Sequence, residues 1–213
     1  MSEETKRLLK YDMRSVFKDM WVFVLIIIGL WLWCYLIYDT MANAVLLICF
    51  VAGMMFLNMG VRDWQIQIRM YVSAGMSRKG IFQVLNIRNA AIFLGGLFIE
   101  AVVAFVAYPV FKTKFFIISG AYLLFIWGFG QITGVLVYHR KKLGQILMII
   151  GYILVILPCT VSFPLGNEAS GFWRVLFDGI TTTTVSVMGI AAVAVLAGGI
   201  CFARKHMKEY MVY

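Results

Sequence analysis

One acidic residue inside a long apolar stretch is the first candidate for chemistry. Glu100 lies in GGLFIEAVVAF. A carboxylate within a membrane-spanning helix is costly, so it must face the protein interior, pair with another group or stay protonated. Gln131 and Thr133, in a later apolar stretch, are candidate partners. Two interpretations stay open: Glu100 lines a substrate cavity or carries a proton, or it is a neutral acid bonded to a neighbouring helix.

The sequence lacks the patterns that would make the chain an enzyme by itself. It has no GxxxxGK(S/T) phosphate-binding loop, no HExxH metal motif and no GxSxG nucleophile elbow. His139 and His206 stand beside Arg or Lys at predicted helix ends, where solvation by lipid headgroups explains them. The four cysteines show no metal-ligand spacing. We therefore predict no catalytic residue and no metal or cofactor bound directly by this chain.

The composition places most of the chain in lipid. Hydrophobic residues make up 62% of the 213 residues, charged residues only 14%, and the mean hydropathy is +0.90. Soluble domains average roughly 25% charged residues. The net charge of +9 is not accompanied by a basic face with interleaved aromatic residues, so it does not indicate nucleic-acid binding. The class is an integral membrane protein.

Six apolar stretches have the length of a membrane-spanning helix, which is about 20 residues. We predict an all-α fold whose transmembrane domain covers residues 21–203, followed by a cytoplasmic tail at residues 204–213. Pro158 and Pro164 should kink or end the fifth span. The spans cover residues 21–38, 42–60, 90–111, 115–137, 144–164 and 183–203.

The distribution of cations predicts the orientation. The segments on the same side as the N-terminus carry 16 of the 19 Lys and Arg residues, and the other side carries Lys112, Lys114 and Arg174. Cytoplasmic connections are enriched in Lys and Arg. We therefore expect both termini in the cytoplasm.

Residues 1–20 have the pattern of an amphipathic helix in the inner headgroup layer. A charged flank that only sets the topology is the alternative. The cationic face comprises Lys10, Arg14 and Lys18, and the apolar face comprises Leu9, Met13, Val16, Phe17 and Met20.

Two connections between spans are more than simple loops. In the inner segment, residues 61–89, Trp64, Ile68 and Tyr71 fit one helical face, which predicts a short helix presented to a soluble partner. Gly75 permits a turn there, and Ser77 can cap the next helix. The outer segment, residues 158–182, predicts a re-entrant hairpin with an amphipathic helix. Ordinary loops are the alternative for both.

Several motifs, taken in order, resemble the permease subunit of a type-2 ABC exporter. LLKYDMRSVFKDM resembles the connecting helix that runs into the first span of that family, and AGMSRKGIF resembles the end of its coupling helix. YHRKKLGQ resembles its second inner loop, and residues 158–182 resemble its outer re-entrant helices. The resemblance covers nearly the whole chain.

The resemblance implies an ATP-driven exporter in the cell membrane, built from two permease chains, identical or paralogous, and two P-loop ATPase subunits. ATP and Mg²⁺ would be bound by the ATPase subunits, and the cargo would be a small hydrophobic or amphipathic molecule such as a peptide or lipid. The substrate cavity would lie near Glu100. The implied ATPase contacts are Arg62, Asp63, Trp64, Arg69, Ser77, Arg78 and Lys79.

Two other functions stay open. A substrate-capture subunit of a vitamin importer also has six spans and about this length, although the basic N-terminal helix and the large inner segment disfavour it. A regulatory or immunity membrane protein without transport activity would have little need for Glu100.

Overall fold

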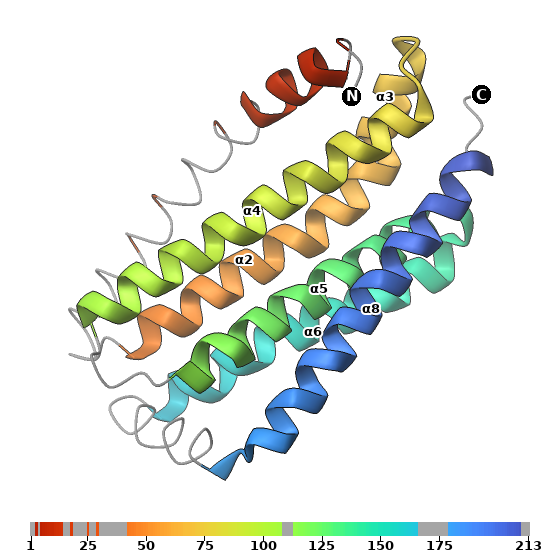
Figure 1. Ribbon diagram of the computed structural model, residues 1–213. Helices are drawn as coiled ribbons and strands as arrows, with labels where there is room; N and C mark the ends of the chain where they lie inside the picture. The colour runs from red at the N-terminus through yellow and green to blue at the C-terminus, as the bar shows by residue number, and fades with distance from the viewer. Residues whose placement is uncertain are drawn as a thin grey trace.

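The computed structural model is all-helical over the residues that it describes, with no strand among them (Figure 1). Nearly all of the predicted first span, Phe17 and residues 166–178 of the outer segment lie outside the described residues. The described backbone comprises residues 3, 5–14, 18, 25, 29, 42–107, 113–165 and 179–209. Side chains are described for the same residues except 42–50, 100, 102–107, 113–115, 158–165 and 209.

Long helices make up most of the described chain. They are α2 (Ala42–Arg62), α4 (Arg78–Ala107), α5 (Thr113–His139), α6 (Lys141–Leu165) and α8 (Thr182–Glu209). A π-helix, η1 (Asp63–Gln67), and the short α3 (Ile68–Ser73) continue directly from α2. Residues 5–14 are also helical and are called the N-terminal helix here. The long helices match the predicted second to sixth spans, but several extend further.

The non-helical connection between α3 and α4 is shorter than the polar composition of residues 61–89 predicts. Gly75 makes the turn with a φ of 79°, as its freedom from a Cβ atom predicts. The amide of Gly80 donates to Ser77 Oγ at 3.2 Å, which confirms Ser77 as the cap of α4. Helix α4 therefore starts at Arg78, so the second half of the predicted inner connection belongs to a long helix.

Two other helix ends can be compared with the sequence prediction. Helix α6 continues through Pro158 and ends at Leu165, one residue beyond the predicted end of the fifth span at Pro164. A proline removes one backbone donor, and neighbouring groups in a membrane helix can compensate for that loss. Helix α8 extends to Glu209, so most of the predicted tail is helical.

Helix α5 is the centre of the bundle and contacts α2, α4, α6 and α8. Glycines make the closest crossings: Gly60 of α2 faces Gly130 and Gly134 of α5, and Gly128 of α5 faces Gly199 of α8. A Cβ atom at any of these positions would collide with the facing backbone. Small residues at such crossings let membrane helices approach and gain dispersion contacts that lipid does not supply.

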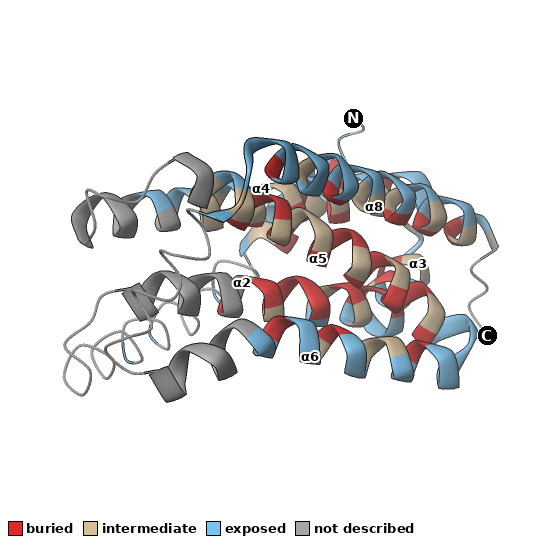
Figure 2. Cartoon of the chain, turned by 90° about the horizontal axis from the view of Figure 1, so that it is seen from below, coloured by how far each residue is buried: buried red, intermediate tan, exposed pale blue. Residues whose placement is uncertain are grey.

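The outer helix faces are apolar and exposed. Figure 2 shows buried residues concentrated on α2 and α5, with exposed residues along α4, α6 and α8. Leu94 on α4, Ile153 on α6 and Ile190 on α8 are each more than half exposed. Three helical segments, Arg78–Ile99, Phe116–His139 and Thr182–Lys208, are long and apolar enough to cross a membrane by length and composition. These features indicate a helical membrane protein.

One end of the bundle collects most of the described cations and is called the basic end here. It comprises the N-terminal helix, α3, the start of α4, the turn at Arg140 and the end of α8. Two contacts tie it together: Arg78 donates to the carbonyl of Lys208, and the rings of His139 and His206 lie 5.0 Å apart. The exposed cations at this end are Lys6, Arg7, Lys10, Arg14, Arg62, Arg69, Arg78, Lys79, Arg140, Lys141, Lys142, Arg204, Lys205 and Lys208.

Candidate functional site

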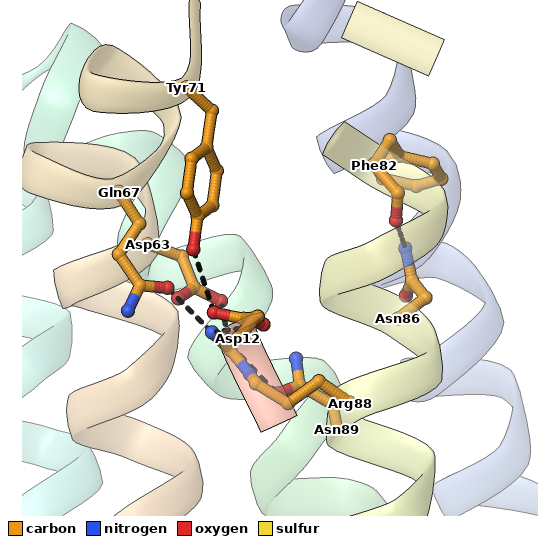
Figure 3. Close-up of polar contacts among 8 residues, drawn as sticks. All are labelled: Asp12, Asp63, Gln67, Tyr71, Phe82, Asn86, Arg88 and Asn89. Atoms are coloured by element: carbon orange, nitrogen blue, oxygen red, sulfur yellow. Dashed lines mark hydrogen bonds and ion pairs between the residues drawn. The ribbon is translucent and has the colours of Figure 1, made fainter. Parts of the chain in front are cut away.

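A fully buried arginine lies at the centre of a polar cluster near the basic end. Arg88 of α4 has 0% of its surface exposed. Its Nη2 donates to Asp63 Oδ2 at 2.6 Å, and its Nη1 donates to Gln67 Oε1 at 2.5 Å (Figure 3). Asn89 Oδ1 accepts from Arg88 Nε and Nη2 at 3.3 and 3.1 Å. The planar guanidinium has five N–H donors, so it can join several acceptors at once.

The N-terminal helix contributes a second carboxylate to this cluster. Asp12 is 1% exposed, and its Oδ2 lies 3.5 Å from Arg88 Nη1. The hydroxyl of Tyr71 on α3 donates to Asp12 Oδ1 at 2.7 Å. Asp12, Asp63, Gln67, Tyr71, Arg88 and Asn89 are called the Arg88 cluster here. It joins the N-terminal helix, η1, α3 and α4 (Figure 3).

The π-helix explains how η1 and α3 aim several side chains at Arg88. Asp63, Gln67 and Tyr71 are spaced by four residues. In an α-helix this spacing drifts by about 40° per step, because a turn takes 3.6 residues. The wider turn of η1, with i→i+5 hydrogen bonds, reduces the drift between Asp63 and Gln67. Single π turns inside α-helices are frequent at functional sites.

The charges of the cluster do not balance. Two carboxylates, Asp12 and Asp63, face one guanidinium, and their side chains are at most 2% exposed. Asp63 Oδ1 is buried without a hydrogen-bond partner among the described residues. Burial raises the pKa of Asp63 to about 6, since the loss of water outweighs the opposing effect of Arg88. Burial and the hydrogen bond to Asp12 also raise the pKa of Tyr71 above its usual range.

Trp64 does not lie where its proposed role as a partner contact requires. The predicted face of Trp64, Ile68 and Tyr71 exists, but it points into the bundle. Trp64 is 1% exposed, and its ring lies 6.3 Å from Tyr138 and 6.2 Å from His139. Burial of so large an apolar side chain is favourable, so the helix turns this face inward. The expectation that Trp64 contacts an ATPase from an exposed position is therefore wrong. The same expectation for Asp63 is also wrong, because Asp63 is 1% exposed.

The other predicted coupling residues are exposed at the basic end: Arg62, Arg69, Ser77, Arg78 and Lys79. Between them, Ile66 and Met70 are 51% and 56% exposed. We call Gln65, Ile66, Arg69 and Met70 the outer face of α3, although the first two residues belong to η1. This face combines two exposed apolar side chains with the cation Arg69, and a partner could contact it.

The N-terminal helix also turns an unexpected face inward. Lys10, Arg14 and Lys18 are exposed, as predicted. The buried positions are Thr5 and Asp12, and Leu8 packs against the apolar cluster around Trp64. The helix packs against the start of α4, where a Cβ atom on Gly80 would meet the Thr5 hydroxyl at 3.0 Å. Its position in the inner headgroup layer stays a prediction.

The three candidate cavity residues do not come together. Gln131 and Thr133 are 6% and 0% exposed, and Thr133 Oγ1 has no hydrogen-bond partner among the described residues. Helices α4 and α5 run antiparallel, with Leu97 beside Gly120. Residue 100 therefore lies level with residues near 117, about 21 Å along the axis from Gln131 at 1.5 Å per residue. The expected pairing of Glu100 with Gln131 or Thr133 is not found.

Sequence reasoning missed the Arg88 cluster as a unit. Arg88 was assigned to the inner connection as one of several cations, and Asp12 received no role. One signal was available: Asp12 is the acid among the cations of KRLLKYDMRSVFK, and Asp63 follows Arg62. Pairing either acid with Arg88 requires contacts across 76 and 25 residues, which only the tertiary structure supplies.

Comparison with known proteins adds no assignment. No family model, no curated protein and no solved structure matches this chain. The functional argument therefore depends on the residues and geometry described above.

Proposed function

We propose that this chain is the membrane-spanning permease subunit of an ABC exporter of the type-2 class. A separate P-loop ATPase would bind its basic end and drive export of a small hydrophobic or amphipathic cargo, such as a peptide or a lipid-like molecule. The assembly would hold two ATPase subunits with their ATP and Mg²⁺, and a second permease chain. The residue motifs that resemble this family support the proposal.

One geometric observation carries the proposal. The outer face of α3 lies on a short helix between two long ones, and the same segment is tied to α4 by the Arg88 cluster. Ile66 and Met70 provide an apolar contact, and Arg69 provides a charged one. A partner that pushed on this face would act on α2, α4 and the N-terminal helix together, because packed elements move as rigid bodies.

The proposal includes six spans with both termini in the cytoplasm of a bacterial inner membrane. Helices α2 and α6 have 21 and 25 residues, enough to cross a hydrocarbon core of about 30 Å. The exposed cations of the basic end favour the cytoplasmic side for that end. Reporter fusions at residue 110 and at the C-terminus should report opposite sides of the membrane.

The decisive experiment is co-purification from the native host in mild detergent. The wild-type chain should bring down a P-loop ATPase, detected by mass spectrometry and by ATP hydrolysis in the eluate. An Ile66→Ser/Met70→Ser double variant should lose most of it. Leu94→Ser is the matched control, because Leu94 is 64% exposed on α4 away from this end. Recovery of no ATPase with the wild-type chain, or equal recovery with the double variant, would contradict the proposal.

A further inference from the structure

The Arg88 cluster holds two buried carboxylates and one guanidinium. With both carboxylates ionised, the cluster holds one excess negative charge in side chains that water does not reach. An uncompensated buried ion is strongly destabilising, so the cluster must bind a cation, bind a proton or open to water. Asp63 Oδ1, buried and without a hydrogen-bond partner among the described residues, is the free acceptor.

We propose that the Arg88 cluster is a proton-binding site, and that the bound proton holds the N-terminal helix against α3 and α4. A proton on Asp63 Oδ1 neutralises the excess charge and leaves Oδ2 free to accept from Arg88. Arg88 then forms a single balanced pair with Asp12. This inference does not depend on the exporter proposal, because it concerns only contacts within the chain.

The N-terminal helix is the element that should respond when the proton leaves. Asp63 lies in η1, which continues α2 and is anchored beside the buried Trp64. Asp12 lies on a separate helix, and its contact with Arg88 is longer, 3.5 Å against 2.6 Å for Asp63. Repulsion between the two carboxylates is therefore relieved most easily by movement of Asp12 towards water. Loss of the proton should release the N-terminal helix from the bundle.

The groups around Asp63 are consistent with titration at this position. Arg88 of α4 and Arg62 of α2 favour its ionised form, whereas Asp12 opposes it. The hydroxyl of Tyr71 on α3 donates a hydrogen bond to Asp12. Helix α5 presents Tyr138 and His139 to the ring of Trp64. His206 of α8 in turn contacts His139, so both histidines need a control.

The test is a distance measurement between two spin labels on the full-length protein in lipid nanodiscs at pH 5, 6, 7 and 8. The labels go on Tyr11→Cys and Met70→Cys, which are exposed positions on the N-terminal helix and α3, in a background without the native cysteines. A Met70→Cys and Lys142→Cys pair is the control within the bundle. The same pairs are measured in Asp63→Asn, Asp12→Asn and His139→Gln/His206→Gln backgrounds.

We expect one short distance at pH 5 and a growing longer one as the pH rises. The transition should be centred near pH 6, the pKa of Asp63, with the ratio of docked to released helix changing about tenfold or more. Both Asn variants remove the excess charge, so both should stay docked at every pH. The histidine variant should show the same pH transition as the wild type. The distance within the control pair should stay constant at every pH.

Three results would overturn the inference. One is a wild-type distance that does not change between pH 5 and pH 8. Another is the same pH transition in Asp63→Asn and Asp12→Asn, which would place the titrating group elsewhere. The last is loss of the transition in the histidine variant, which would assign it to His139 and His206. If Asp63→Asn fails to fold, the Asp12→Asn variant still decides the test, because a pH transition in that variant would contradict the inference.

Discussion

Replacing Arg88 by methionine should be among the most damaging changes in the described part of the chain. Methionine fills much of the space of the arginine side chain with apolar atoms, and it leaves Asp12 and Asp63 without their cation. Removal of one partner from a buried ion pair costs about 3–5 kcal/mol. The oxygens of Gln67 and Asn89 also lose their donors, at about 1–3 kcal/mol each if they stay dry.

These contributions are not additive, because one shift of the N-terminal helix can hydrate several groups together. We therefore expect a loss of about 5 kcal/mol in the free energy of unfolding at pH 5, where the N-terminal helix is docked, and this loss is comparable to the whole stability of many proteins. Arg88→Lys should lose about 3 kcal/mol. It keeps the charge, but a single ammonium cannot reach Asp63, Gln67 and Asp12 in the geometry of a guanidinium.

The assay is reversible unfolding in mixed micelles, followed by the fluorescence of the six tryptophans. Arg78→Met is the matched control, since Arg78 is an exposed cation of the same helix with a hydrogen bond to the Lys208 carbonyl. It should lose about 1 kcal/mol or less. Adding Asp12→Asn and Asp63→Asn to Arg88→Met should restore about half of the loss. Equal losses for Arg88→Met and Arg78→Met would refute the reasoning, as would a triple variant less stable than Arg88→Met.

Three further predictions concern the fold and its pH dependence. Gly60→Leu should lower the stability by about 3 kcal/mol or prevent folding, because any side chain there meets the backbone of Gly130, whereas Gly95→Leu, with open space around it, should change the melting temperature little. Ser77→Ala should cost about 1 kcal/mol through loss of the cap on α4, measured by the same unfolding assay. The pKa of Asp63 is about 6 when folded and 3.8 when unfolded, so the folded state binds more protons between these values and the stability falls as the pH rises through this window. The wild-type chain should therefore lose about 2 kcal/mol more than Asp63→Asn between pH 4 and pH 7, and parallel curves would contradict this assignment.

The long helices were predictable because their signal is local. A run of about 20 apolar residues must satisfy its backbone internally, and a helix does so within the segment itself. The turn at Gly75 and the cap at Ser77 were predictable for the same reason, since each depends on the conformation of a few neighbouring residues. The end of α8 at Glu209 was not, because there the helix continues beyond the apolar run into the basic end of the bundle.

The candidate site was only partly predictable. The sequence predicted a short helix within residues 61–89, and it identified the helical face of Trp64, Ile68 and Tyr71. It could not decide whether that face points outward, because a large apolar side chain suits both a binding surface and a core. The pairing of Glu100 with Gln131 failed for a related reason, since the register of two helices depends on where Gly60, Gly130 and their neighbours let the backbones meet.

The sequence alone determined the helical membrane class, the positions of most long helices and the gathering of cations in particular connections, since these follow from composition and from contacts within a few residues. Only the tertiary structure decided which charges are buried together. Asp12, Asp63 and Arg88 are far apart along the chain and look like ordinary members of charged segments. Their role arises because packing removes water from all three at once, and an ion without water is stable only beside a partner.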